Sequence, residues 1–479
     1  MISRPLGYFR EAVQAYLFGA TLLVDAFIVA FNFPELIQTL FFSGATSAFL
    51  VPVCVRYMKD HSEYSSVYST FINLAVIITI SISLLFLAFS QGIIDLIAPG
   101  FTSTGKEMTR ALFIIMLPVI TFHTILSVMK AFLNAKEHFA GPELSGVIWN
   151  VAFILSALFL KERLGIYSLA IGATVGSLLQ VAMQVPYLRR YNVRYTPTVN
   201  LRHPAITEAK QLFTGALVAT SIVPINSFVG RVIASYLPHG EVAALSYAFR
   251  IFILPFSLFA VPIYTVLFTK LSKLYHSRDW QGIYAHVDSS IVLVAITLIP
   301  CTILLCSVGD AAITVLYQRG AFTPQDSLLT NRALFGYSVG LIFYALSLSF
   351  VRIFNSLHDM KTPALVGITS IAMNATLAYL LMIPLQNLGI ALATSITSLY
   401  NFMVLYVLFK KRTGYSVKKT TIRTVSRSLL AGILLLSAIF AVRQFIQATF
   451  VVLLAAASLT LLVYGFSFRQ YYSTYLKYR

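Results

Sequence analysis

Charged residues are scarce in this sequence. They make up 11% of the 479 residues, whereas 58% are hydrophobic and the mean hydropathy is +0.80. A soluble domain carries roughly 25% charged residues, so this chain has too little polar material to cover a surface that faces water. Apolar runs of about 20 residues recur along it, each long enough to cross roughly 30 Å of hydrocarbon. The sequence therefore predicts a membrane protein and leaves no room for a soluble domain between the runs.

Acidic residues and cysteines are also few. Only 17 Asp and Glu stand against 35 Lys and Arg, and no acid follows Asp359. Cys54, Cys301 and Cys306 lie in or beside apolar runs, at spacings that suit neither a zinc site nor a disulfide framework, so we expect small core residues. No Gly-x-x-x-x-Gly-Lys-Ser/Thr loop occurs, which argues against ATP as the energy source.

The apolar runs predict an all-α polytopic protein with about fourteen transmembrane helices. The second and eighth runs are too long for one straight crossing and contain Pro34 and Pro255, so we expect bent or broken helices there. With the N-terminus inside, most of the 35 Lys and Arg fall in interior loops and the C-terminal tail, which predicts both termini in the cytoplasm. The runs lie near residues 2–19, 21–55, 66–92, 108–135, 141–160, 166–187, 209–237, 242–274, 283–308, 329–356, 362–384, 387–409, 425–444 and 448–468.

The net charge of +18 does not indicate nucleic acid. In this topology the basic clusters at 189–210 and 410–427 lie on the cytoplasmic side, where they mark orientation and face anionic lipid. We therefore expect membrane lipids, and no nucleic acid, as the partner of these clusters.

An internal repeat organises the chain. Matches between 101–178 and 322–399 share an offset of 221 residues, and six predicted helices precede the repetition. An even number gives two pseudo-symmetric six-helix lobes of the same orientation, with a site expected between them near the midplane. The matching positions include Pro142, Leu144 and Gly146 with Pro363, Leu365 and Gly367. The predicted parts are an N-lobe at 1–190, a cytoplasmic linker at 191–208, a C-lobe at 209–412, and a C-terminal helix pair with a cytoplasmic tail at 413–479.

Arg250 is the candidate site residue that position alone selects. It lies well inside the eighth run, flanked by Phe249 and Ile251, where a charge is costly unless it faces a cavity or a partner. The planar guanidinium donates two parallel hydrogen bonds and suits a phosphate or pyrophosphate. A structural ion pair is the alternative.

Short motifs run along nearly the whole chain. They are Ser3-Arg4, Leu6-Gly7, Arg10, Asp25-Ala26-Phe27, Val29-Ala30-Phe31, Pro34, Gly44-Ala45, Ser47, Pro52, Ala98-Pro99-Gly100-Phe101, Gly320-Ala321-Phe322-Thr323, Ser338-Val339-Gly340-Leu341 and Lys361-Thr362-Pro363. In this order they resemble the lipid II flippases, the MurJ (MviN) family within the multidrug/oligosaccharidyl-lipid/polysaccharide exporter superfamily.

The resemblance implies a transporter, not an enzyme, with no catalytic residue and no cofactor. It would flip lipid II, a peptidoglycan precursor on a polyprenyl pyrophosphate, across the bacterial inner membrane for cell-wall synthesis. The headgroup would cross by alternating access through a cationic central cavity while the tail stays in lipid along a groove formed with the C-terminal helix pair. The membrane potential or an ion gradient would supply the energy. We expect a monomer, with the cell-wall synthesis machinery as a further partner.

The same resemblance assigns substrate contacts. Arg250 and Arg10 are expected in the cavity, and Arg4 is weaker because it lies close enough to a helix end to reach the interface. Asp25 begins the second helix, so it is either a carboxylate favoured by the helix dipole or a gate residue that pairs with an arginine. Pro34, Gly44 and Pro255 are candidate hinge or packing positions.

The chain departs from the family where an Arg-Arg pair and a Glu are expected before Gly-Ala: it has Gln38, Thr39 and Ser43 there, and Ile253 replaces another expected carboxylate. Arg231 is an extra cation. It either partly replaces the lost pair or caps the outer end of its helix near Pro238.

A sodium site in the second lobe would depend on neutral oxygens such as Asn374 and Thr394, because no Asp or Glu follows Asp359. These are weak metal candidates, and no other metal site is expected. An exporter of another polyprenyl-linked saccharide, or a drug/ion antiporter of the same superfamily, is the alternative function. A membrane glycosyltransferase is disfavoured because the exterior connections are short and hold no convergent acid/base set.

Overall fold

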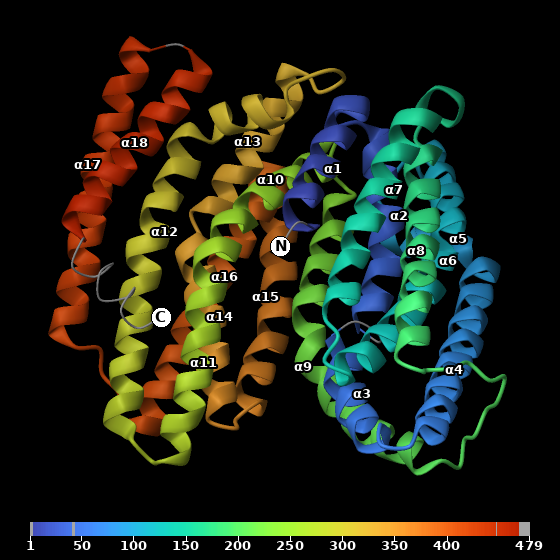
Figure 1. The fold of residues 1–479 in the computed structure, drawn as a ribbon. Helices are drawn as coiled ribbons and strands as arrows, with labels where there is room; N and C mark the ends of the chain where they lie inside the picture. Colours follow the sequence, from blue (N-terminus) through green and yellow to red (C-terminus); the bar gives the residue numbers. More distant parts are fainter. Residues whose placement is uncertain (1–2, 41–43, 447, 469–479) are drawn as a thin grey trace. The chain divides into compact units, whose positions relative to one another are not determined.

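The structure is a computed structural model that describes residues 3–40, 44–446 and 448–468 (Figure 1). The described residues form helices joined by short connections, and no strand occurs among them. They divide into two compact units. The first comprises Met1–Ala243 with Gly320–Phe322, and the second comprises Ala244–Arg319 with Thr323–Arg479. The prediction of an all-α polytopic protein is confirmed.

The first unit is a bundle in which α6 packs against α2, α3, α4 and α8, while α7 packs against α1 and α8. Its helices are α1 (Ser3–Phe18), α2 (Leu22–Gln38), α3 (Gly44–Tyr57), α4 (His61–Ala88), α5 (Ser90–Ile97), α6 (Ser103–Ala135), α7 (Ala140–Leu164), α8 (Tyr167–Arg190) and α9 (Pro204–Ala234).

The chain enters the second unit within α10. There α16 packs against α13, α14 and α15, and α12 packs against α11, α13 and the last two helices. The helices are α10 (Glu241–Pro255), the π-helical turn η2 (Phe256–Ala260), α11 (Val261–His276), α12 (Trp280–Tyr317), α13 (Pro324–Ser338), α14 (Leu341–Ser356), α15 (Lys361–Leu385), α16 (Asn387–Thr413), α17 (Lys419–Phe445) and α18 (Thr449–Ser467).

Each predicted membrane run contains a helix. Among the described residues, nine helices are long and apolar enough to cross a membrane, or ten if the bent pair α13 and α14 is one span. A count of fourteen therefore stays a prediction, as do the limits of the four predicted parts. The helix α9 belongs to the first unit, although the predicted C-lobe begins at residue 209. The short helix α5 was not predicted.

The prolines of the two long runs have different effects. In the eighth run, α10 ends at Pro255 and the π-helical turn η2 follows, because proline cannot donate the next helical hydrogen bond; Glu241–His276 is nevertheless one span by length and hydropathy. In the second run, α2 continues through Pro34, and residues 41–43, which precede α3, lie outside the described residues. A bend of 47° between α13 and α14 was not predicted from the sequence. Gly340, at this bend, lets α16 pack closely, because a Cβ there would lie 2.5 Å from the Cα of Ser395.

The 221-residue repeat extends to hydrogen bonds. Thr174 donates to the carbonyl of Ile115 at 2.9 Å, and 221 positions later Ser395 donates to the carbonyl of Gly336 at 2.6 Å. Backbone conformations repeat as well: one position, occupied by Gly165 and then Gln386, has φ 53° and ψ −131° in both halves. The N-cap threonines of α6 and α13, Thr102 and Thr323, are also 221 residues apart.

At one pair of equivalent connections, the repeat keeps the hydrogen-bond geometry but uses different residue types. His138 accepts a hydrogen bond from the amide of Gly141 at 3.3 Å and contacts the Tyr191 hydroxyl at 3.2 Å. At the same offset, Asp359 accepts from the amide of Thr362 at 3.0 Å and forms an ion pair with Arg412. The equivalent connections, α6–α7 and α14–α15, are therefore held by hydrogen bonds of a histidine in the first half and by an ion pair in the second.

The C-terminal helix pair is fixed to α12 at both ends of α17 (Figure 1). At the start, Asp288 on α12 accepts from the Thr421 hydroxyl at 2.8 Å and the Tyr415 hydroxyl at 3.1 Å. At the other end, Arg443 forms an ion pair with Asp310 on α12. The pair α17 and α18 is thus held as one body with α12.

We expect the Asp359–Arg412 pair to stabilise the second unit in a pH-dependent way. Burial alone would raise the pKa of Asp359, but hydrogen bonds from Thr362 and the charge of Arg412 outweigh it and hold the pKa below its ordinary value. A depressed carboxyl pKa contributes stability above the unfolded-state pKa of about 4, and this is lost as pH falls through the folded-state pKa. Asp359→Asn should therefore lower the melting temperature at pH 7, and the difference from wild type should shrink below about pH 4. The exposed acid Glu162, changed to Gln, is the control, and a pH-independent difference for Asp359→Asn would contradict this assignment.

Candidate functional site

Arg10 lies on α1 and is packed against α7. Its guanidinium carbon is 4.6 Å from the ring centroid of Trp149 and 5.2 Å from that of Phe153, and its side chain is only 11% exposed. Such stacking places a cation on the negative faces of aromatic rings. Arg10 also forms an ion pair with its neighbour Glu11, whose side chain is 9% exposed. The predicted cation is therefore inside the first unit with an acid beside it.

Glu11 was not selected as a site residue from the sequence. Its signal was available, because two adjacent opposite charges inside an apolar run each need a partner at membrane depth. Arg10 and Glu11 together add no net charge, so an anionic ligand of Arg10 would have to compete with Glu11.

Asp25 is 1% exposed, and both of its carboxylate oxygens accept backbone hydrogen bonds. The donors are the amides of Gly240 at 2.5 Å and Ala243 at 2.8 Å, at the start of α10. A carboxylate at a helix N-terminus satisfies amides that have no partner within the helix and is favoured by the helix dipole. Asp25 thus caps α10, a helix distant in sequence, and its recorded partners are amides, not an arginine.

Two glycines let neighbouring backbones approach at this place. Gly240 has φ +88°, and a Cβ there would lie 2.3 Å from the carbonyl oxygen of Ala20. Gly320 has φ +60°, with the carbonyl of Tyr16 2.4 Å from its Cβ position, and the next amide, that of Ala321, donates to Tyr16 at 2.8 Å. We call this group the clasp; its members are Tyr16, Ala20, Asp25, Gly240, Ala243, Gly320 and Ala321.

Arg231 on α9 reaches α2. It donates a hydrogen bond to Asn32, and its Nη1 is 3.4 Å from Glu35 Oε2. Its side chain is 30% exposed, and that of Glu35 is 44% exposed. Arg231 therefore lies beside α2, the helix in which the expected Arg-Arg pair is missing, and it is paired with an acid there.

Arg250 lies on α10 in the second unit, where its side chain is exposed. The preceding residue, Phe249, packs against Phe252 and Tyr337 with ring centroids 5.6 and 5.5 Å apart. These aromatic contacts fix the face of α10 that points inward, and Arg250 lies outside that cluster. Arg250 and the capped amide of Ala243 are on the same helix.

Other predicted residues are placed as follows. Arg4 is in the first turn of α1 and Gly44 begins α3, but their side-chain environments, and all of Ser43, lie outside the described residues. Asn374 is buried on α15, and Thr394 on the adjacent α16 donates to the carbonyl of Ile390 at 3.4 Å. Within the described residues no group of three or more His, Cys, Asp and Glu could hold a metal ion. The sodium candidates stay a prediction.

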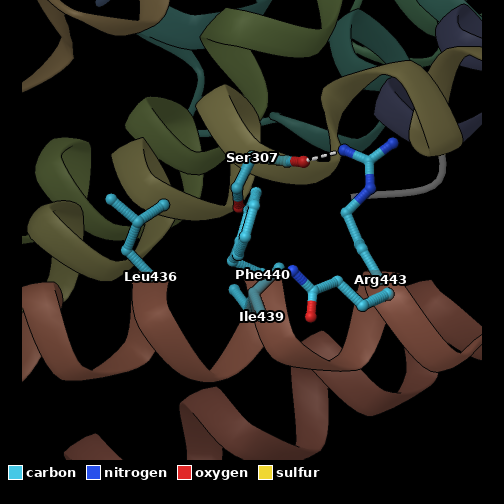
Figure 2. Close-up of a pocket in the computed structure, with 6 residues that line it drawn as sticks. Ser307, Leu436, Ile439, Phe440 and Arg443 are labelled. Carbon is cyan, nitrogen blue, oxygen red and sulfur yellow. Dashed lines mark hydrogen bonds between the residues drawn. The ribbon is translucent and has the colours of Figure 1, made fainter.

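A pocket of about 360 Å³ lies between α12 and α17 (Figure 2). Leu436, Ile439 and Phe440 line it, and Arg443 crosses its rim to the carbonyl of Ser307. Val308, with φ −130° and ψ 20°, interrupts the helical backbone of α12 there, so Arg443 satisfies a carbonyl next to the kink. This pocket was not predicted from the sequence.

Two repeated helical units with charges held inside apolar helices define a multi-pass membrane protein of the transporter class. A sequence model of the family "Lipid II flippase MurJ" matches residues 14–461. The chain therefore belongs to the lipid II flippase MurJ family, which confirms the resemblance.

Individual relatives agree. A probable lipid II flippase MurJ of Vibrio cholerae is 29% identical over 92% of this chain and 86% of its own length. One from Buchnera aphidicola of the pea aphid strain APS is 28% identical over 92% and 88%. A solved structure titled "Lipid II flippase MurJ, inward closed conformation" is 26% identical, covers 98% of this chain and 97% of its own, and superposes with a TM-score of 0.85. An inward-facing MATE transporter, 14% identical with a TM-score of 0.72, covers 85% of this chain and 94% of its own and shows the shared fold.

We expect Asp25→Ala to loosen the start of α10. Loss of an N-cap costs about 1–2 kcal/mol, so amide hydrogen exchange at 240–243 should accelerate roughly 5- to 30-fold. Glu35→Gln, which removes a carboxylate elsewhere on α2, is the control and should leave that exchange unchanged. Equal exchange rates in Asp25→Ala and wild type would show that Asp25 does not cap α10.

Proposed function

We propose that this chain flips lipid II across the bacterial inner membrane by alternating access, with both termini in the cytoplasm. Membership of the lipid II flippase MurJ family over residues 14–461 carries the assignment, and the match to a solved flippase over 98% of the chain supports it. The active form is a monomer, with lipid II as substrate, membrane lipids around it and the cell-wall synthesis machinery as a partner.

Arg10 binds the pyrophosphate by exchange with Glu11. Glu11 neutralises the guanidinium, which is stacked on Trp149. A pyrophosphate offers more acceptor oxygens and more charge than one carboxylate, so it displaces Glu11 and gains charge-assisted hydrogen bonds. Stacking on α7 meanwhile holds the guanidinium plane in place, which lowers the entropy cost of binding.

Arg250 supplies a second cation, and α10 connects it to the clasp. The helix carries the Ala243 amide, bound by Asp25, at its start and Arg250 in its middle, and it ends at Pro255. A displacement of α10 that breaks the Asp25 cap therefore also displaces Arg250. Arg4 contributes at the edge of the site, and Pro34, Gly44 and Pro255 act as hinge positions.

A second function, export of another polyprenyl-linked saccharide, is favoured by one observation. Gln38, Thr39 and Ser43 replace the expected charges, so the headgroup-binding site carries fewer ionic contacts than the family pattern has. Both substrates share a pyrophosphate, so Arg10 and Arg250 would be used by either. Competition with a polyprenyl pyrophosphate that bears a different sugar separates the two.

Complementation tests the function directly. Expression of the wild-type chain should rescue a strain depleted of its lipid II flippase, and the purified chain should flip lipid II in liposomes. Arg250→Ala should lower the flipping rate about 10- to 100-fold, since hydrogen bonds to charged groups are worth about 1.5–3 kcal/mol. Arg278→Ala, at a connection outside the helices, is the control. Failure of the wild type to rescue or flip, with membrane insertion verified, would refute the substrate assignment.

Arg231 tests whether the lost cations are replaced. If Arg231 binds substrate as well as Glu35, Arg231→Glu should lower flipping about tenfold or more, for the same loss of a charge-assisted bond. The swap Glu35→Arg with Arg231→Glu should then restore the melting temperature but not flipping. Normal flipping in Arg231→Glu, or full recovery in the swap, would show that the pair is structural.

A further inference from the structure

A second polar group lies inside the first unit, separate from Arg10 and the clasp. His123 and Lys130 on α6 are seven residues apart, which places them on one face, and α8 packs against α6. Ser177 on α8 is 3.0 Å from His123 Nε2, and Gln180, one turn on, interacts with the same ring. Glu143 at the start of α7 interacts with Lys130. We call these five residues the polar stripe.

The stripe extends deep into a membrane helix. His123 is 12 residues from the end of α6 at Ala135, or about 18 Å at 1.5 Å per residue. An ionisable group at such depth is costly and marks an ion or proton pathway more often than a packing contact. Glu143, in contrast, is exposed. The stripe therefore joins the middle of α6 to the aqueous end of the bundle.

Hydrogen bonding defines the tautomer of His123. The Ser177 hydroxyl has one proton, which it donates to the carbonyl of Ala173 at 2.7 Å. It therefore accepts from His123, and Nε2 carries the hydrogen. In the neutral ring this leaves Nδ1 as the atom that takes up a further proton.

A partner for the protonated ring is already present. Gln180 is 6% exposed, its amide nitrogen donates to the carbonyl of Ser145 at 2.9 Å, and its side chain also hydrogen-bonds to the His123 ring. Because the amide nitrogen is used by Ser145, Oε1 is the atom that accepts from the ring. Protonation of His123 makes this hydrogen bond charge-assisted and therefore stronger, so the protonated ring has a buried acceptor beside it.

The charged groups around His123 limit how many protons the polar stripe can hold. The charged neighbour acting on His123 is Lys130 on its own helix, α8 contributes the neutral Ser177 and Gln180, and Glu143 on α7 acts on Lys130. Two bases on one buried face hold two protons less readily than one, because like charges repel. An arriving anion relieves that repulsion and favours uptake of the second proton.

The internal repeat shows that the fold does not require these groups. At the offset of 221, His123 corresponds to Tyr344, Lys130 to Val351 and Glu143 to Ala364. The second half builds the same helices with no charge at any of the three positions. Packing alone therefore does not explain the stripe.

Building on the proposed flippase function, we propose that the polar stripe is a proton-binding site of the first unit and couples flipping to the proton gradient. Its bases select a proton over Na⁺, since an amine and an imidazole cannot hold a hard cation that requires oxygen ligands. Uptake of one proton at His123 Nδ1 offsets part of the charge of the anionic headgroup while it crosses.

Reconstituted full-length chain with lipid II in liposomes tests this at zero membrane potential, with and without an imposed pH gradient. We expect wild-type flipping to change at least fivefold with the gradient. His123→Gln and His123→Tyr, the second copying the residue at the repeat position, should both lose this response. His138→Gln, a histidine outside the stripe at the α6–α7 connection, should keep it. Two independent variants guard against a folding defect in either one.

A second measurement does not depend on flipping. On addition of lipid II to the detergent-purified wild type, a pH dye should report uptake of about one proton per chain, and His123→Gln should take up none. Proton coupling at this site is overturned if wild-type flipping does not depend on the pH gradient. It is also overturned if both His123 variants keep the gradient response and proton uptake. Absence of any flipping by wild type under all conditions refutes instead the flippase function on which it rests.

Discussion

The cost of holding a charge in hydrocarbon governs how this chain uses its few acids. A lone charge at the centre of a bilayer costs about 3 kcal/mol or more, so each buried ionic group requires a partner. The buried Arg10 has Glu11, and the buried carboxylate of Asp25 has two backbone amides; the partly exposed Arg231 is likewise paired with Glu35. With 17 acids for 35 cations, acidic partners are scarce, and Arg10 in addition lies over the aromatic rings of Trp149 and Phe153.

The two halves of the repeat share the helix contacts and backbone conformations, whereas the charged residues differ between them. Thr174 in the first half and Ser395 in the second donate a hydrogen bond between equivalent pairs of helices. The positive-φ backbone conformation of Gly165 recurs at Gln386. The polar residues that surround His123 have no charged counterpart in the second half. Constraints on backbone geometry are local and survive duplication, whereas a buried charge is costly and is kept only in the half that uses it.

The sequence predicted a helix within each membrane run and also the repeat, because hydropathy and proline act over short distances; it missed α5 and the bend between α13 and α14. It also selected Arg10, Arg250 and Asp25, through depth or resemblance. It could not show that Asp25 caps α10, since the donors are 215 and 218 residues away. It likewise missed the pairing of Arg231 with Glu35 and the kink of α12 beside Arg443, because both depend on which helices pack together.

The Asp25 cap also constrains how the clasp can open. The first amides of α10 have no partner within the helix, and Asp25 satisfies two of this group of donors. If the cap is released into an apolar environment, each orphaned amide costs about 1–3 kcal/mol, and the carboxylate costs more. Release is affordable only where water replaces both partners. Any state in which Asp25 leaves α10 must therefore admit water to the start of that helix, so breaking the cap and hydrating this end are one event.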